Sequence, residues 1–486
     1  MQFVLALHVC ASVVLAVYTV HQMALLLLYW RARLRPVSAA SAETAGDLPP
    51  VLIQLPMYNE RLLAQRVIEA VAAFEYPADR LRILVLDVST DDTRDSALAA
   101  VCAALGRGVD IAYVHRAERR GFKAGALAHG LSVAQARPGE LVAVFDADFV
   151  PAPDFLQRVL VGRAAFADSQ VGFVQTRWDY LNRDETLVTR AQAIVLDMHF
   201  VIEQIARSTA GLPMAFNGSG GMWRRSCIDD AGGWQADTLT EDLDLSFRAV
   251  LRGWRGCYLP GESAAGELPR DVSAYKLQQA RWARGSLQTV RKLIGALLRS
   301  SLVLHSKIAG ALHLTGYFVH PLIFVTSLTT PLLLMQPAAL SGPAGTVGLL
   351  SVAPLLAMFV SSTARGRAPW QFARDLLPAL LLGVGVAFSN SVAMTRALRT
   401  RETGEFARTP KGASGDGSSP RARPDLTTWG ELALALYAIC AMLLLVYAGA
   451  PHLAAPLLLY AGGYGGVWAA QMRDSTNIAK RTNSKD

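Results

Sequence analysis

The sequence predicts an α/β domain with a mostly parallel sheet, set between α-helical membrane segments. Hydrophobic residues make up 52% of the 486 residues. The mean hydropathy is +0.27, which is too apolar for an ordinary soluble chain. Within residues 48–282, short apolar runs of strand length alternate with helical stretches, as expected for strands joined by crossover helices.

The first element is an apolar run at the amino terminus. Phe3 to Trp30 covers about 28 residues, more than the roughly 20 helical residues that cross a hydrocarbon core. A cleaved signal peptide would show a basic start, a shorter apolar core and a small-residue cleavage site, and none of these is present. We therefore expect a transmembrane helix within residues 1–32. Because Arg31 and Arg33 follow it, the chain beyond should lie on the cytoplasmic side.

The α/β domain is expected over residues 48–282. Its apolar runs have the length of buried strands, and helical stretches lie between them. The expected strands are Val51–Leu55, Ile83–Asp87, Asp110–Val114, Leu141–Asp146 and Val171–Gln175, and the expected helices include Arg61–Ala73, Thr93–Leu105 and Phe122–Ala136. Ligands of such parallel sheets bind outside the carboxyl ends of the strands.

A basic amphipathic helix is expected over residues 283–306. Leu287, Val290, Ile294 and Leu297 recur at three- and four-residue steps, and basic residues fall largely between them. This pattern is typical of a helix that lies in the membrane surface. A solvated helix packed on the α/β domain is the alternative.

The remaining chain predicts two pairs of spanning helices with a different segment between them. We expect one pair within residues 309–363 and the other within 429–470. Residues 368–395 contain only about 14 apolar residues between charged or amide positions, which is typical of an interfacial or re-entrant helix. The loop 396–428 and the tail 471–486 are basic, so both should be cytoplasmic, which requires that 368–395 does not cross.

Charge and cysteine content narrow the class of protein. The net charge is +8, but Lys and Arg form no dense block and lie beside apolar runs, so we expect no nucleic-acid partner. The five cysteines form no CxxC pair, which argues against disulfides and a cysteine zinc site and fits a reducing compartment. The excess of Arg over Lys points to a bacterial genome. We therefore expect a multi-pass protein of a bacterial inner membrane with a cytoplasmic α/β domain.

Carboxylates follow two of the expected strands. Asp87 ends one strand, where it could accept hydrogen bonds from a base or ribose, although a turn or helix-cap role is the alternative. Asp146 and Asp148 follow another strand, one residue apart, and could hold Mg²⁺ or Mn²⁺, since hard cations prefer oxygen ligands. Such a metal would neutralise a leaving diphosphate. A plain turn is the alternative.

Two further motifs lie in the second half of the domain. Glu241 and Asp242 precede a helical stretch, where an acid can cap the helix or take a proton from an acceptor hydroxyl. Gln278, Arg281 and Trp282 come just before the amphipathic segment. The guanidinium suits a diphosphate and the indole suits a sugar face, while a snorkelling Arg and Trp at the membrane interface is the alternative.

Together these motifs resemble the processive family-2 glycosyltransferases, which include cellulose synthase, its plant cellulose-synthase-like relatives, and hyaluronan and chitin synthases. Those enzymes carry a first Asp, a DxD, a TED and a QxxRW in this order. Segments that resemble the plant mannan and glucan synthases in particular are Pro56–Glu60, Gly121–Leu127, Gln175–Trp178, Phe216–Gly218 and Glu267–Pro269. The resemblance covers nearly the whole chain. One departure is Val88, where the relatives usually have a second Asp.

The resemblance implies an inverting GT-A fold and a role for each matched residue. Asp242 is the implied base, and a metal is implied at Asp146 and Asp148. Donor binding is implied for Tyr58, Glu60, Asp87, Lys123 and Asp146, and binding of the acceptor or diphosphate for Glu241, Gln278, Arg281 and Trp282. Residues 406–411 resemble the gating loop of cellulose synthase, which implies gating roles for Phe406, Thr409 and Lys411.

The function implied is transfer of glucose or mannose from a nucleotide-sugar to a growing β-glycan, with export through the protein's own helices. UDP-glucose and GDP-mannose are both candidate donors, and accessory export subunits are conceivable partners alongside the lipid bilayer. The alternative is a non-processive enzyme of the ceramide glucosyltransferase type that acts on a lipid. The gating-like loop and the helices after the domain favour polymer synthesis. His129, His199 and His320 have no metal-ligand spacing and are interpreted as structural.

Overall fold

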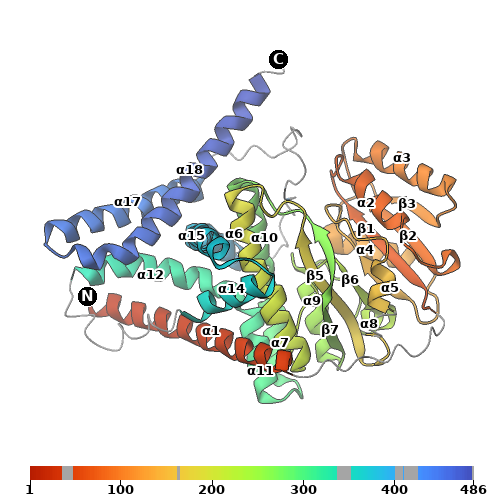
Figure 1. Ribbon diagram of the computed structural model, residues 1–486, viewed down its shortest axis with the longest axis horizontal. Coiled ribbons are helices and arrows are strands. Elements are labelled where there is room, and N and C mark those ends of the chain that lie inside the picture. The colour runs from red at the N-terminus through yellow and green to blue at the C-terminus, as the bar shows by residue number, and fades with distance from the viewer. Residues whose placement is uncertain (35–47, 161–164, 336–351, 400–408, 410–424, 484–486) are drawn as a thin grey trace.

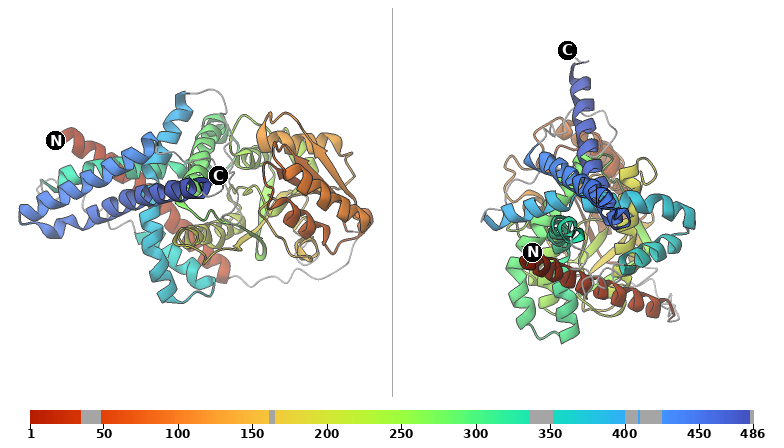
Figure 2. Two further views of the ribbon diagram at one scale, coloured as in Figure 1. Left: turned by 90° about the horizontal axis from the view of Figure 1, so that it is seen from above. Right: turned by 90° about the vertical axis from the view of Figure 1, so that its left-hand side faces the viewer.

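The computed structural model divides the chain into an α/β domain and a set of long helices. Figure 1 shows the α/β domain on the right, α1, α12, α17 and α18 on the left, and α6, α10 and α14 between them. Figure 2 shows the same division from two other directions. The structure describes residues 1–34, 48–160, 165–335, 352–399, 409 and 425–483.

A seven-stranded sheet forms the centre of the α/β domain, in the order β3-β2-β1-β4-β6-β5-β7. Six strands run parallel, and β6 is antiparallel to both of its neighbours. The strands are β1 Val51–Met57, β2 Leu81–Asp87, β3 Ile111–His115, β4 Leu141–Val144, β5 Val171–Tyr180, β6 Gly221–Arg224 and β7 Arg255–Gly266. The predicted mostly parallel sheet is confirmed.

Helices cover both faces of the sheet, and each face has its own apolar core. Ile53 and Leu55 of β1 pack with α2 and α3 on one face, while Leu52 packs with α4 on the other. Strands buried on both faces read as continuous apolar runs, which is why these strands were visible in the sequence. The domain helices are α2 Ala64–Ala72, α3 Thr93–Gly106, α4 Phe122–Val133, α5 Phe155–Leu160, α8 Arg225–Asp230 and α9 Glu241–Leu251.

Two strands were not predicted, and their sequences explain why. β6 has four residues, of which the first is glycine and the last arginine, so it forms no apolar run of strand length. β7 contains Pro260, which cannot donate a hydrogen bond to a neighbouring strand. The pairing of β7 with β5 shifts register between Leu259 and Ser263, so the proline falls in an irregularity of the ladder.

Five of the described helices are long and apolar enough to cross a membrane: Gln2–Leu34, Gly316–Leu334, Pro369–Arg399, Leu426–Tyr447 and Pro451–Thr476. These runs contain α1 (Gln2–Leu34), α12 (Val319–Leu334), α15 (Pro369–Gly385), α16 (Ala387–Arg399), α17 (Leu426–Tyr447) and most of α18 (Ala455–Asn483). In addition, α14 (Val352–Ala364) is a shorter apolar helix. A membrane protein is the conclusion that these helices support.

The segment predicted as interfacial or re-entrant, residues 368–395, is a broken helix whose first part crosses the direction of the other long helices. It is broken into α15 and α16 on either side of Val386. Figure 1 shows α15 nearly end-on, while α1, α12 and α17 run across the same view, and Figure 2 again shows it crossing their direction. The length and apolarity of 369–399 would suffice for a span. An interfacial position therefore stays a prediction.

The amphipathic segment is part of a longer helix. α10 runs from Val272 to Arg299, so it begins eleven residues before the predicted start at 283. Its Val290, Leu293 and Leu297 pack against Phe247 of α9. The predicted apolar stripe is thus turned towards the α/β domain, and a position in the membrane surface stays a prediction. α6 (Leu187–Asp197), α7 (Gln204–Thr209) and α11 (Leu304–Leu314) complete this middle layer.

Candidate active site

Two adjacent cavities lie where the central strands end and the middle layer of helices begins. The larger, of about 120 Å³, brings together residues that are far apart in the sequence: Tyr58, Glu60, Val88, Arg119, Phe122, Lys123, Asp146, Asp148, Gln278, Arg281 and Thr409. The smaller, of about 20 Å³, is lined by Asp148, Phe149, Trp178, Asp179, Tyr180, Leu196, Glu267, Gln278 and Trp282, among others. Asp148 and Gln278 contact both cavities, so the two are neighbours.

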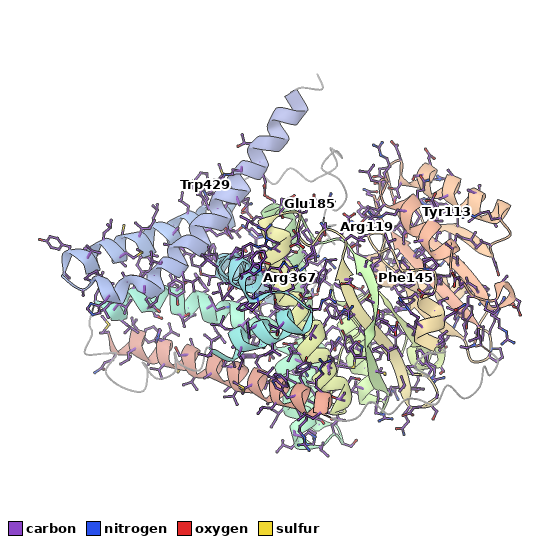
Figure 3. All side chains as sticks on the ribbon, viewed as in Figure 1. Tyr113, Arg119, Phe145, Glu185, Arg367 and Trp429 are labelled. Atoms are coloured by element: carbon purple, nitrogen blue, oxygen red, sulfur yellow. The ribbon has the colours of Figure 1, made fainter. Side chains whose placement is uncertain are left out.

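One end of the larger cavity carries stacked planar groups. The guanidinium of Arg119 lies 3.4 Å from the ring centroid of Tyr58 and 5.2 Å from that of Phe122. Figure 3 shows Arg119 on the side of the α/β domain that faces the helices. Such a stack is a cation–π contact and offers flat surfaces to a nucleobase. Arg119 belongs to no local motif and was not predicted, because only the fold brings it over Tyr58.

Asp87 does not line the cavity, although donor binding was predicted for it. Its side chain is fully buried and accepts hydrogen bonds from the Ser89 amide at 2.9 Å and the Tyr113 hydroxyl at 2.5 Å. The His115 ring lies 3.4 Å from the same carboxylate. Burial, then Asp87 itself, raises the pKa of Tyr113, which keeps that hydroxyl a donor. Val88 is the residue of this pair that faces the cavity.

The DxD carboxylates lie at the exit of β4. Asp146 is one-third exposed, and its Oδ1 is 2.6 Å from the Lys123 ammonium. Its backbone amide donates to Ser219 Oγ at 3.0 Å. Asp148 is buried and contacts both cavities. The two oxygen donors predicted for a metal therefore line one cavity.

These two carboxylates would bind a hard cation only together with further ligands. Among the described residues, no group of three or more His, Cys, Asp or Glu side chains is arranged to hold a metal ion. Asp146 and Asp148 would supply two carboxylates, and a bound diphosphate and water would have to supply the other ligands. Mg²⁺ is commonly held in this way, by one or two carboxylates and substrate phosphates. The donor set thus fits a divalent metal that enters with a nucleotide.

Lys123 connects the DxD pair to the TED motif. Its ammonium is 3.7 Å from Glu241 and donates to the Gly218 carbonyl at 2.9 Å. Burial lowers the pKa of Lys123, but the nearby carboxylates of Asp146 and Glu241 outweigh burial, so the pKa is raised. The residue is therefore a buried cation directed at the larger cavity.

Asp242 lies in the first turn of α9 and has a perturbed titration. Burial, followed by the charge of Glu241, raises the pKa of Asp242 to about 7, against the opposing effects of Lys123, the Leu243 amide and Arg281. Neither Glu241 nor Asp242 lines the two cavities, and Lys123 is the direct link between them and the larger one. A carboxylate of this kind can exchange a proton near neutral pH.

Gly218 lies beside both Asp242 and Lys123, and it cannot be replaced by a larger residue without strain. A Cβ at this position would lie 2.8 Å from Asp242 Oδ2 and 3.3 Å from Lys123 Nζ. Its φ of +83° also favours glycine. The backbone of the Phe216–Gly218 segment therefore packs directly on the candidate base.

The α10 motif lies between the cavities. Arg281 lines the larger one, Trp282 the smaller one, and Gln278 both. The smaller cavity also has Phe149, Trp178 and Tyr180, so it offers four aromatic side chains next to the DxD, which suits an acceptor sugar. The predicted pairing of Arg281 with a diphosphate site and Trp282 with a sugar site is compatible with this geometry.

Of the gating-like loop, the structure describes one residue. Thr409 is buried and lines the larger cavity. Phe406 and Lys411, the other two residues predicted for this loop, lie outside the described residues.

Comparison with known proteins agrees with this geometry. Residues 49–285 match the family described as glycosyltransferase like family 2. A glucomannan 4-beta-mannosyltransferase 1 of Oryza sativa subsp. japonica is 42% identical over 52% of this chain and 49% of its own length. A glucomannan 4-beta-mannosyltransferase 7 of Arabidopsis thaliana is 33% identical over 76% of this chain and 64% of its own length. The chain thus spans about half to two-thirds of these relatives.

A solved structure supports the fold. The mannosyltransferase PcManGT of Pyrobaculum calidifontis, in complex with GDP-Man and Mn²⁺, has a TM-score of 0.53 and 23% identity to this chain. It covers 81% of this chain and 99% of its own. The predicted resemblance is confirmed for residues 49–285, which form a family-2 glycosyltransferase domain with the GT-A fold, and the relatives that this domain matches include glucomannan 4-beta-mannosyltransferases.

Proposed function

We propose that this protein is a membrane glycosyltransferase that transfers a hexose from a nucleotide-sugar to a growing β-glycan. One observation carries the proposal. Asp146, Asp148, Lys123 and Arg281 line one cavity, beside a second cavity with four aromatic side chains. A site that joins cation-binding and anion-binding groups to aromatic rings suits a sugar diphosphate and a sugar acceptor. The family-2 domain supports the same class of reaction.

Mannose from a GDP-linked donor is the first candidate, and glucose from UDP-glucose is the second. The named relatives are glucomannan 4-beta-mannosyltransferases, which supports a mannosyl donor. The Arg119–Tyr58 stack would receive either nucleobase by its flat face. Competition between the two donors would separate these candidates.

The reaction we propose inverts the anomeric centre. Asp242 accepts the proton of an acceptor hydroxyl, whose oxygen forms a bond to the anomeric carbon. The bond from that carbon to the diphosphate oxygen breaks, and its electron pair leaves with the nucleoside diphosphate. Lys123 and Arg281 stabilise the charge that develops on the diphosphate, because fixed cations in a buried site need no reorganisation. A Mg²⁺ or Mn²⁺ at Asp146 and Asp148 would supply further neutralisation.

Asp242 must reach an acceptor for this scheme to work. Its carboxylate lies beside Gly218, to which Lys123 donates a hydrogen bond, and it does not line either cavity. General bases often gain their substrate contact only in the complex.

Processive synthesis is proposed over transfer of a single sugar to a lipid. The presence of Thr409 in the donor cavity and the five candidate membrane helices that accompany the domain support a polymer that leaves through the helices. A glycolipid product of the ceramide glucosyltransferase type is the second candidate. It would use the same catalytic residues, so only the product can separate the two.

The test is turnover of labelled nucleotide-sugars by the full chain in nanodiscs, with analysis of product size. We expect a polymer from GDP-mannose or UDP-glucose in the presence of Mg²⁺ or Mn²⁺, and loss of turnover with a chelator. A labelled product that extracts into organic solvent would favour the glycolipid alternative. Absence of turnover with every common nucleotide-sugar, in protein that binds the nucleotides, would contradict the proposal.

A further inference from the structure

The loop Phe216–Gly220, here called the linking loop, makes hydrogen bonds to three parts of the candidate site. The Gly218 carbonyl accepts a hydrogen bond from Lys123 at 2.9 Å. Ser219 Oγ accepts from the Asp146 amide at 3.0 Å, and the Ser219 carbonyl accepts from the Trp178 indole at 3.0 Å. The donor side, the DxD and the acceptor side therefore share one loop. Its position must be fixed for the three to be fixed relative to one another.

Asn217 of the linking loop is held by its backbone amide and by both polar atoms of its side chain. Its backbone amide donates to Gln175 Oε1 at 2.7 Å. Its side-chain oxygen accepts from Gln204 Nε2 at 2.6 Å, and its side-chain nitrogen lies 3.1 Å from His199 Nε2. His199 Nδ1 in turn lies 3.0 Å from the Glu203 carboxylate. The result is a chain of contacts from Glu203 through His199 to Asn217.

The hydrogen-bond pattern assigns the proton on His199. Gln204 Nε2 donates to the Ala215 carbonyl at 3.0 Å, which fixes the orientation of that amide. The oxygen of Asn217 must then face Gln204, so its NH₂ group faces the imidazole. A donor needs an acceptor, and His199 Nε2 must be unprotonated. The proton is therefore on Nδ1, from which it is donated to Glu203.

The surroundings of Glu203 suit an anion that orients the imidazole. Burial raises the pKa of Glu203, but the hydrogen bond from His199 and the charge of Arg207 outweigh it and leave the pKa lowered. His199 and Glu203 both lie in a π-helical turn, Met198–Glu203, between α6 and α7. Such turns are rare in proteins and are frequent at functional sites.

We propose that Glu203 and His199 are positioning residues, which act through Asn217 to hold the linking loop against Asp242 and Lys123. The proposal rests on the proposed function. Neither residue lines either cavity, so they would contribute to the reaction only through the loop. Without the contacts of Glu203 and His199, the Gly218 backbone would move away from Asp242 and Lys123.

A double-mutant cycle tests this, with Asn217→Ala, His199→Leu and the double variant in the full chain. A displacement of about 1 Å at a reacting centre can cost about 100-fold in rate. We expect each single variant to lower kcat/KM by about 10- to 100-fold, and the double variant to lower it no further than Asn217→Ala alone. Independent, multiplicative losses would overturn the proposal, because His199 would then not act through Asn217.

A conservative change at Glu203 should preserve activity, whereas an apolar change should not. Glu203→Gln retains an oxygen that accepts from His199 Nδ1, so we expect at least half of the wild-type kcat/KM. Glu203→Leu should match His199→Leu. Because Gly218 contributes to the surroundings of Asp242, the Leu variant should also shift the acidic limb of the pH profile, which Glu203→Gln should leave in place. Equal activity of the Gln and Leu variants would contradict the assignment.

Hydrogen–deuterium exchange gives a readout that does not depend on turnover. Peptides covering the linking loop should exchange faster in His199→Leu and Asn217→Ala than in the wild type. Ser208→Ala is the matched control, since Ser208 lies on α7 and accepts from the Tyr258 amide, away from the loop. Unchanged exchange in the loop would overturn the proposal. If exchange changes but no nucleotide-sugar is turned over by the wild type, the proposed function fails and the positioning of the loop stands.

Discussion

At the residue scale, two adjacent acids at the start of α9 have distinct environments. Glu241 lies 3.7 Å from the Lys123 ammonium, a direct opposite charge. The pKa of Asp242 is raised to about 7 by burial and by Glu241. Acid–base sites typically contain pairs of titratable groups whose environments make their pKa values different. The raised pKa supports Asp242 as the group that moves a proton.

This assignment predicts the pH dependence of the reaction. A base works deprotonated, so kcat/KM should fall about tenfold for each pH unit below about 7 and level off above it. Asp242→Asn should lower kcat by about 10²- to 10⁴-fold and remove this limb. The measurement is kcat/KM between pH 5.5 and 8.5. A wild-type profile that stays flat down to pH 5.5 would exclude Asp242 as the base.

The raised pKa of Asp242 also predicts that stability falls as pH rises, whereas activity increases. An unfolded Asp titrates at about 3.9, while folding raises the pKa of Asp242 to about 7. Between these values the folded state binds more protons, so stability is lost as pH rises. Asp242→Asn should therefore melt above the wild type at pH 8, and the gap should narrow as pH falls below 7. Asp95→Asn, on the exposed face of α3, should show no such gap. A lower melting temperature for Asp242→Asn at pH 8 would contradict this account.

The sequence could reveal a site residue only where that residue belongs to a local motif. Asp146 and Asp148 follow a strand, and parallel strands end at one edge, so their place at the cavity could be anticipated. Asp87 fits the same rule, but its side chain turns into the domain because Tyr113 and Ser89 bind it there. His199 has no metal-ligand spacing, which predicted a structural role, and its partner Asn217 is brought to it only by tertiary folding.

At the element scale, α10 presents different chemistry on its two sides. Residues 278, 281 and 282 face the cavities. Ser273 and Lys276 lie on the opposite side of the helix and Gln279 lies on its flank, given 3.6 residues per turn. Ser273 donates to Asp474 at 2.9 Å, and Tyr317 donates to Gln279 at 3.1 Å. The active-site helix is thus tied to the long helices by polar contacts.

The central contact of this group is a buried ion pair. Lys276 lies 2.8 Å from Glu431 of α17 and donates to Gln471 of α18 at 2.7 Å. Both charges are nearly inaccessible to solvent. Burying two charges costs about as much as their attraction returns, so an apolar pair of similar size would be about as stable. The pair therefore contributes mainly the register of α10 against α17 and α18.

This predicts that breaking the pair and replacing it differ. Lys276→Met leaves a buried, unpaired carboxylate and should cost about 3–5 kcal/mol of stability. Lys276→Met with Glu431→Leu should recover most of that loss. Thermal unfolding in detergent measures both. A Lys276→Met variant as stable as the wild type would show that the pair is not buried as described.

The strands show the same limit of local patterns. β1, β2 and β4 are continuous apolar runs because both of their faces are buried, so the sequence predicted them. β7 has Pro260 and Gly261 in its middle, and the register shift opposite Thr176 is what accommodates them. Only pairing with β5 makes that segment a strand, and pairing is not visible in one sequence.

At the scale of the whole molecule, the long helices and the α/β domain lie at opposite ends (Figure 2). α1 begins at the end furthest from the sheet and runs towards the domain (Figure 1). The two cavities lie at the carboxyl ends of the strands, next to α10, which is tied to α17 and α18. A product that leaves the smaller cavity would therefore start its path beside the helices.

Cysteines placed across the molecule allow its orientation to be tested. Cys102 is exposed on α3, in the α/β domain, while Cys10 and Cys440 are exposed on the apolar helices α1 and α17. A maleimide that cannot cross membranes should reach Cys102 only from the side on which the domain lies. Lipid should shield the other two. Cys227 is buried and should not react in the folded protein.

If the α/β domain is cytoplasmic, inverted membrane vesicles should be labelled and intact spheroplasts should not. Arg31 and Arg33 at the end of α1 are the charges on which this orientation rests. Cys102→Ser should abolish the labelling of inverted vesicles, which shows that the signal comes from the domain. Labelling of intact spheroplasts that Cys102→Ser removes would place the domain outside. A nucleotide-sugar donor, which is made in the cytoplasm, would then have no route to the cavity, and the proposed function would fail together with the orientation.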